Sequence, residues 1–180
     1  PDSIGVDCTL RGIMVGLNFS FDGYQLVIVN DDNTAGITLF ATDVIDGVTP
    51  EEGDVVVVEG TISQFNGLTQ IQAVSVTIES SGNTIPNPIS VDELSENTEN
   101  RYVQILADLE SDVQWDGNGE NVNKNFTNPN GETQVIRIDK DVPVSNFAYN
   151  PMTDGTQVMV TGVGGQFDPV GMRKKVEESD

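Results

Sequence analysis

Residues 53 to 66 read GDVVVVEGTISQFN, and residues 155 to 168 read GTQVMVTGVGGQFD. Each segment begins with glycine, has a second glycine seven positions later, and ends in Gln-Phe followed by Asn or Asp. Apolar and polar residues alternate up to the second glycine, as they do in a half-buried strand, and the final Asn or Asp favours a turn. The chain therefore contains a duplicated strand and hairpin, and the second copy lies 102 residues after the first.

Further strand patterns surround each copy at corresponding places. Each repeat opens with one strand and continues with a hairpin whose turn is rich in Asn, Asp and Gly. The strands expected around the first copy are 8–16, 24–30, 36–41 and 68–79. Those expected before the second copy are 102–109, 120–127 and 133–139. The matching last strand of the second repeat, 171–176, is short and contains the basic run Arg173 to Lys175.

Two small β domains joined by a linker account for this arrangement. Residues 80–88 read SSGNTIPNP, and their Gly, Ser, Asn and Pro content argues against regular structure. A capping-box pattern that starts at Ser90 predicts a short helix over 91–97. Five short strands per domain favour small barrels over a sandwich. We therefore predict an all-β chain with one barrel over residues 1–82 and another, opened by the short helix, over 83–180.

Three runs of the sequence carry a family resemblance: VVVVEGTISQFNGLTQIQAVSV at 55–76, PNPISVDELSENTENRYVQI at 86–105 and VMVTGVGGQFD at 158–168. They resemble the tandem OB-fold modules of Bacteroidetes secreted nucleases and related surface proteins. The resemblance implies two tandem five-stranded OB-fold-like Greek-key barrels, secreted or at the cell surface, that act as a nucleic-acid-binding accessory region of a larger multidomain chain. The second repeat departs from the family pattern, because Asp168-Pro169 replaces the expected Asn-Gly.

The composition argues against catalysis. The chain has no histidine, which removes the commonest general base and the commonest metal ligand. Its only cysteine, Cys8, can form neither an internal disulfide nor a thiolate zinc site. Paired carboxylates carry little information among 29 acidic residues. We therefore assign no catalytic residue and no cofactor, and expect a non-enzymatic module.

Charge and hydropathy restrict the partners. The net charge is −21, and residues 1–90 contain Arg11 as their only base, so neither half resembles a surface selected for polyphosphate. The longest apolar runs have four residues, against the roughly 20 needed to cross a bilayer, so no membrane insertion is expected. The chain begins at Pro1 without a leader pattern, which is typical of a mature or excised fragment.

Aromatic residues are the candidate ligand contacts. OB-folds bind ligands across strands 2 and 3, between the loops that join strands 1 to 2 and 4 to 5. The aromatic candidates at these places are Phe19, Phe21, Tyr24, Trp115 and Phe126. Phe65 and Phe167, which end the two repeated segments, are instead expected to plug the ends of their barrels.

Basic and acidic residues supply weaker candidates. Lys124 and Arg137 fall on adjacent expected strands of the second repeat, so any nucleic acid would bind there; surface ion pairs are the alternative. Two acidic, amide-rich loops have the oxygen ligands that calcium prefers, but we favour ordinary turns without an ion, because Asn and Asp favour turns for their own reasons. These loops contain Asn30, Asp31, Asp32 and Asn33 in the first repeat and Asp116, Asn118 and Glu120 in the second.

Three functions remain open. The first is weak binding of single-stranded nucleic acid, which the fold analogy favours and the charge opposes. The second is binding of a neutral glycan or a protein partner through the aromatic loops, which the charge does not oppose. The third is a purely structural spacer.

Overall fold

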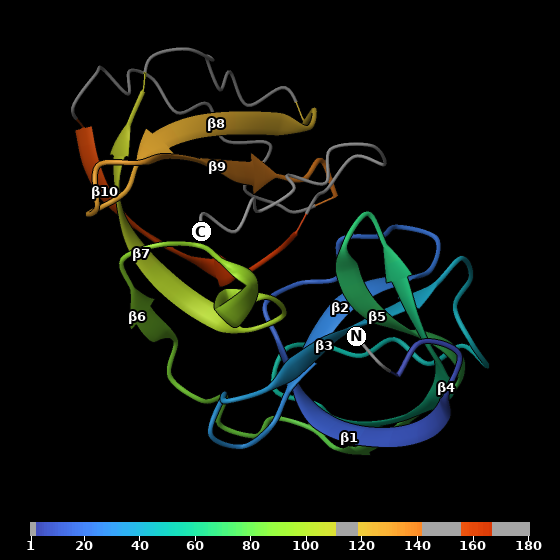
Figure 1. The fold of residues 1–180 in the computed structure, drawn as a ribbon. Helices are drawn as coiled ribbons and strands as arrows, with labels where there is room; N and C mark the ends of the chain where they lie inside the picture. The colour runs from blue at the N-terminus through green and yellow to red at the C-terminus, as the bar shows by residue number, and fades with distance from the viewer. Residues whose placement is uncertain (1–2, 111–118, 142–155, 167–180) are drawn as a thin grey trace, which may run out of the picture.

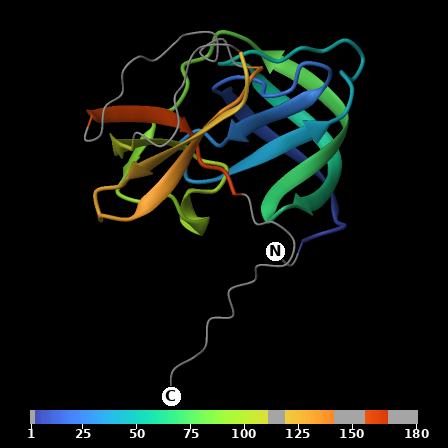
Figure 2. The same ribbon diagram turned by 90° about the horizontal axis from the view of Figure 1, so that it is seen from above.

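The computed structural model describes residues 3–110, 119–141 and 156–166. The described chain is all-β, as predicted, and its strands form two sheets of five that lie side by side (Figures 1 and 2). Within the described ranges no helix is long and apolar enough to span a membrane.

The first sheet is closed. Its strands are β1 Asp7–Val15, β2 Tyr24–Val29, β3 Gly36–Ala41, β4 Val55–Phe65 and β5 Leu68–Ser80. They follow the order β1-β2-β3-β5-β4, and β4 pairs again with β1, so the five strands form a barrel. All pairs are antiparallel except β3 with β5, which is parallel. The ends of β1, β2, β3 and β5 were each expected from the sequence to within two residues, whereas β4 continues past Gly60, where the alternating pattern was expected to end.

Side chains that alternate along the strands fill this barrel. The inward residues form a core that includes Met14, Tyr24, Leu26, Leu39, Val56 and Ile71. The second glycine of the repeat, Gly60, lies at an irregularity in the pairing of β4 with β5. A Cβ atom at Gly60 would overlap the carbonyl oxygen of Gln72, so the close approach of these strands requires glycine.

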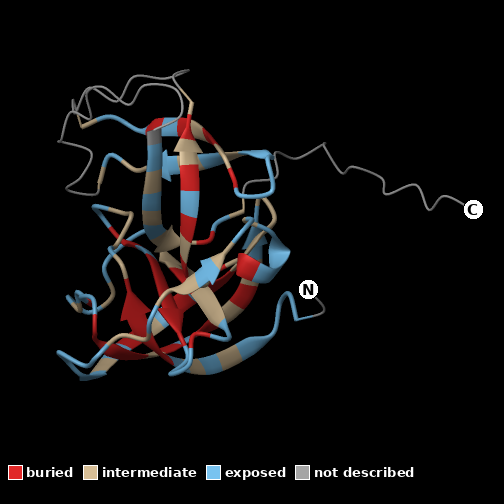
Figure 3. Ribbon diagram, turned by 90° about the vertical axis from the view of Figure 1, so that its left-hand side faces the viewer, coloured by how far each residue is buried: buried red, intermediate tan, exposed pale blue. Residues whose placement is uncertain are grey.

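The second sheet contains β6 Ile89–Val91, β7 Tyr102–Leu109, β8 Val122–Thr127, β9 Thr133–Ile138 and β10 Thr156–Val163. The path runs β10-β7-β8-β9, and β6 pairs in parallel with the start of β7. Gly162 pairs with Val103 of β7, just as Gly60 pairs with Cys8 of β1. The two repeat glycines therefore face the opening strand of their own sheet. Figure 3 shows buried residues in both sheets.

The helix predicted over 91–97 is wrong. Residues up to Val91 belong to strand β6, and only Glu96–Thr98 form a single 3-10 turn. The reason is a shift of the cap: Ser95 and Thr98, not Ser90 and Glu93, make the reciprocal capping bonds. Ser90 instead accepts a hydrogen bond from Gln104 on the neighbouring strand (2.6 Å).

The linker between the sheets has no regular structure from Asn83 to Pro88, as expected, but it is anchored. The backbone N–H and the Nδ2 of Asn83 both donate to the carbonyl oxygen of Gly53 (2.9 Å each). Ile85 packs against the buried residues on the outer side of β1 and β2. These contacts hold the linker against the first barrel.

Candidate functional site

The outer face of strands β1 and β2 is covered by the linker and the second sheet. Ile13, Val15, Val27 and Val29 are almost fully buried, although they lie on the opposite face of their strands from the barrel core. Tyr102, Val163 and Ile85 pack against them. The outer face of β2, which the sequence analysis included in the expected ligand surface, is therefore used to join the two sheets.

Asn33, in the turn between β2 and β3, is the polar centre of this contact. Its side chain is fully buried; Nδ2 donates to the carbonyl oxygens of Tyr102 (2.6 Å) and Asn87 (3.2 Å), and Oδ1 accepts from the N–H of Tyr102 (3.0 Å). Arg101 donates through Nε (3.0 Å) and Nη2 (2.9 Å) to the carbonyl oxygen of Asn33. Asn33 has a φ of 53°, a left-handed conformation that Asn tolerates better than most residues.

Asn100 makes a second polar contact between the sheets. Its Oδ1 accepts from the hydroxyl of Thr38 on β3 (2.6 Å), and its Nδ2 donates to the carbonyl oxygen of Thr69 (2.8 Å). The carbonyl oxygen of Asn100 lies so close to Gly36 that a Cβ there would overlap it. Glu99 completes the contact, because its Oε1 accepts from the N–H of Thr69 (2.7 Å).

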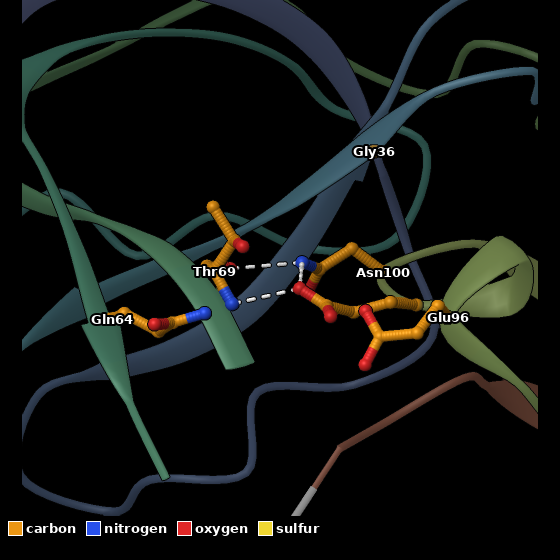
Figure 4. A pocket seen from close by; sticks show the side chains of 6 residues that line it. Gly36, Gln64, Thr69, Glu96 and Asn100 are labelled. Carbon is orange, nitrogen blue, oxygen red and sulfur yellow. Dashed lines mark hydrogen bonds between the residues drawn. The ribbon is translucent and has the colours of Figure 1, made fainter. Parts of the chain in front are cut away.

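A polar pocket of about 440 Å³ lies at this junction, shown in Figure 4. Its lining residues are Gly36, Gln64, Thr69, Glu96, Glu99 and Asn100. Their polar groups already have hydrogen-bond partners: Thr69, Glu99 and Asn100 bind one another, Glu96 accepts from Gln166 (2.5 Å), and Gln64 donates to the carbonyl oxygen of Gly67 (2.6 Å). The lining groups therefore serve mainly to join the two sheets, and few of them are available to bind a ligand.

Two of the predicted aromatic contacts are buried. Tyr24 is 1% exposed in the first core and Phe126 is 0% exposed in the second, so neither ring can stack on a ligand. The hydroxyl of Tyr24 donates to the carbonyl oxygen of Val48 (2.5 Å) and accepts from the N–H of Ile45 (3.0 Å), which ties down the connection after β3. Burial raises the pKa of this phenol. Both residues occupy inward positions of their strands, which alternation alone could have indicated.

The predicted basic contacts are not brought together. Lys124 is only 5% exposed and shares its face of β8 with buried Val122 and Phe126. Arg137 is exposed and pairs with Asp139 (3.5 Å). The alternative prediction of surface ion pairs agrees better with this arrangement, and Lys140 likewise pairs with Asp141 (2.8 Å).

The loop between β1 and β2 keeps its aromatic residues accessible. Phe21 is 85% exposed, and Phe19 is partly exposed. The side chain of Asn18 shapes the loop: Nδ2 donates to the carbonyl oxygen of Gly23 (2.8 Å), and Oδ1 accepts from the N–H groups of Gln25 (2.9 Å) and Ser20 (3.2 Å). The loop thus presents Phe21 from a hydrogen-bonded frame.

Phe65 was missed as an exposed residue. The sequence predicted that it would plug the barrel, but it is 64% exposed at the tip of the β4–β5 hairpin. Asn66 and Gly67 form the turn with φ of 49° and 90°, as the Asn-Gly pair indicates. The β4–β5 hairpin extends beyond the end of the barrel, so its last strand residue before the turn is exposed. The length of the hairpin in the sequence could have indicated this exposure. Its expected counterpart Phe167 lies outside the described residues, as does Trp115.

The first acidic loop uses its oxygens internally. Oδ1 of Asn30 accepts from the N–H groups of Thr34 (2.9 Å) and Ala35 (3.0 Å), and Oδ1 of Asp32 accepts from the hydroxyl of Thr34 (2.6 Å). The hydrogen bond from this hydroxyl lowers the pKa of Asp32. Across the described part of the chain, no three His, Cys, Asp or Glu side chains come together in a way that could hold a metal ion. In the second acidic loop, Asp116 and Asn118 lie outside the described residues.

Comparison with known proteins gives no neighbour for this chain. No protein-family model, no curated protein and no solved structure matches it.

Proposed function

We propose that the chain is a non-enzymatic binding module, built as a pair of OB-folds, that recognises a neutral glycan or a protein partner through the loop between β1 and β2. The strand order β1-β2-β3-β5-β4, with its parallel β3–β5 pair, supports an OB-fold for the first sheet. In the second sheet the order β10-β7-β8-β9 matches the order β4-β1-β2-β3 of the closed first sheet. The resemblance noted in the sequence supports a secreted or surface-bound parent protein.

The observation that carries the proposal is that one face of the first barrel is covered by the second sheet while the adjoining β1–β2 loop stays exposed. The outer face of β1 and β2 packs against Tyr102 and Val163 of the second sheet, whereas Phe21 projects from the adjoining loop. An exposed aromatic ring on a structured loop can stack on a sugar ring or enter an apolar pocket of a protein. Phe19 and Leu17, both partly exposed, extend this apolar surface.

The electrostatics favour a partner that is not a polyanion. The net charge of −21 opposes one at long range. Arg11 pairs with Glu79 (2.7 Å), Arg101 lies in the contact between the sheets, and Arg137 and Lys140 pair with aspartates. Among the residues that the structure describes, few cations are therefore available to neutralise phosphates.

The test is a titration of ¹⁵N-labelled protein with a panel of neutral oligosaccharides and, separately, with a single-stranded oligonucleotide. We expect salt-independent shifts in the amides of residues 16–23 with a member of the neutral panel. Phe21→Ala should weaken that binding about tenfold or more, since one stacked ring is worth roughly 1–3 kcal/mol. The matched control is Val74→Ala, because Val74 is 70% exposed on β5 and should leave binding unchanged.

Single-stranded nucleic acid remains the second candidate, because the strand order that supports an OB-fold also favours it. Such binding should be weak at physiological salt, roughly 10⁻⁴ to 10⁻⁶ M, and should fall steeply as salt is added. Submicromolar binding of the oligonucleotide, or equal losses of glycan binding in Phe21→Ala and Val74→Ala, would contradict the primary proposal.

A further inference from the structure

One part of the outer face of the first barrel stays uncovered. On β2, Val27 and Val29 are buried beneath the linker and the second sheet, but Gln25, on the same face nearer the start of the strand, is exposed. Gln25 pairs with Phe40 of β3, and Phe40 pairs with Gln72 of β5. Because residues opposite one another in register share a face, these three form a row across three adjacent strands (Figure 1).

The side chains of this row point away from the barrel core. The neighbours that precede them in the chain, Tyr24, Leu39 and Ile71, all lie in that core. Gln25 and Gln72 are exposed, and Phe40 is partly exposed. Within the part of the chain that the structure describes, neither side-chain amide of the row has a hydrogen-bond partner. The row therefore presents an aromatic ring between two amides that are available to a ligand.

The row is continuous with the loop between β1 and β2. The N–H of Phe19 donates to the carbonyl oxygen of Gln25 (2.9 Å), and the N–H of Gln25 donates to Oδ1 of Asn18 (2.9 Å). These two hydrogen bonds fix the loop that carries Phe21 beside the first residue of the row.

The chemistry of the row matches a neutral sugar. Its members carry no charge, although the chain has a net charge of −21. An amide both donates and accepts hydrogen bonds, as a sugar hydroxyl does, and an aromatic ring can stack on the apolar face of a sugar ring. Neighbouring strands lie about 4.8 Å apart, so the amides flank Phe40 at a separation of about 10 Å.

A protein partner fits this place less well. A stable protein interface buries roughly 1,200 Å² or more in total. Such an area would extend beyond the row to exposed acids, such as Asp22 in the loop and Asp43 shortly after β3. A single sugar ring can rest on the row without covering them.

We propose that Gln25, Phe40 and Gln72 form a subsite for one ring of a neutral oligosaccharide, next to the β1–β2 loop. This inference rests on the function proposed for that loop, and it selects the glycan from the two partners named there. The ring stacks on Phe40, and the two amides bind its hydroxyl groups. Unlike the surface across strands 2 and 3 expected from the sequence, this subsite crosses the parallel pair of β3 with β5.

The test titrates the ¹⁵N-labelled intact chain with cellohexaose, xylohexaose, β-1,4-mannohexaose and maltohexaose. We expect at least one of them to shift the side-chain amide signals of Gln25 and Gln72 together with the backbone amides of residues 16–23. Gln72→Glu keeps the shape of the side chain but removes its N–H donors, and should weaken this binding at least about tenfold. The matched control is Gln157→Glu, which adds the same charge at an exposed position of β10 and should leave the binding unchanged.

The outcomes separate this inference from the function proposed for the loop. If Phe21→Ala weakens binding and Gln72→Glu does not, the loop keeps its role and the subsite is overturned. If Gln72→Glu weakens binding and Phe21→Ala does not, the subsite stands and the loop loses its role. Absence of binding by all four hexasaccharides, or equal weakening by Gln72→Glu and Gln157→Glu, would also overturn the subsite.

Discussion

Asn33 and Asn100 hold the two sheets together, because each side chain both donates and accepts hydrogen bonds across the contact. Both asparagines are buried with positive φ, and each accepts and donates across the contact. The sequence placed Asn33 in a turn but read it as a calcium candidate, because composition does not reveal which member of an Asn-Asp-Asp-Asn run turns inward. Only the neighbouring sheet, 69 positions along the chain, determines that.

Replacement of Asn33 tests the energetic value of this contact. Asn33→Ala leaves the N–H and the carbonyl oxygen of Tyr102 without their partners in a buried site. We expect the free energy of unfolding to fall by about 2–4 kcal/mol in chemical denaturation. The control is Asn66→Ala, which has a similar positive φ at a hairpin tip and should cost about 1 kcal/mol. Equal losses would show that backbone strain, and not the contact, explains the effect.

Tyr24 makes a prediction about alkaline pH. Because burial raises the pKa of the folded-state phenol above the ordinary value of 10.0, the unfolded chain ionises first as the pH rises. The stability contributed by Tyr24 is therefore complete below pH 10 and is lost above it. Tyr24→Phe should lower stability at neutral pH by about 1–2 kcal/mol, through its lost hydrogen bonds. The substitution should also make the fall in the free energy of unfolding above pH 10 less steep, as measured by urea unfolding. An unchanged dependence on pH above 10 would contradict the role given to Tyr24.

At the scale of elements, the sequence predicted strands well and the single helix poorly. Alternation and Asn/Gly turns determine strands locally, which is why β2, β3 and β7 begin at the expected residues. The segment from Ile89 to Val91 forms a strand because it pairs with β7, a contact distant in sequence that outweighs a capping pattern. Loop residues were predicted by type, but their exposure depends on the length of each hairpin and on which face the second sheet covers.

Gly36, the first residue of β3, tests the fit between the elements. Its Cβ position overlaps the backbone oxygen of Asn100, so Gly36→Ala should push the second sheet away from β3 and cost about 1–3 kcal/mol or more. Gly162→Ala is the matched control, since nothing among the described residues lies within 4 Å of its Cβ position and a smaller loss is expected. Thermal unfolding of both variants measures this difference. A loss at Gly162 as large as that at Gly36 would contradict the packing described.

At the scale of the molecule, the arrangement of the two sheets decides which surfaces can bind a ligand. The repeat in the sequence predicted two similar units joined by a linker without regular structure, and it made no prediction of how they pack. In the structure, Ile85, Tyr102 and Val163 pack against the outer face of β1 and β2. No local pattern indicates this contact, because the sequence does not show whether Val27 and Val29 face the core of the barrel or the second sheet.

Thiol accessibility at Val29 tests this arrangement most directly. In a Cys8→Ser background, Val29→Cys places a thiol on the covered face, and Val74→Cys places one at a position that is 70% exposed. We expect the thiol at position 29 to react at least about 100-fold more slowly with a water-soluble reagent, because reaction requires the sheets to separate or the barrel to unfold. Similar rates at the two positions would show that the outer face of β2 is open, and would return it to the candidate surfaces for a ligand.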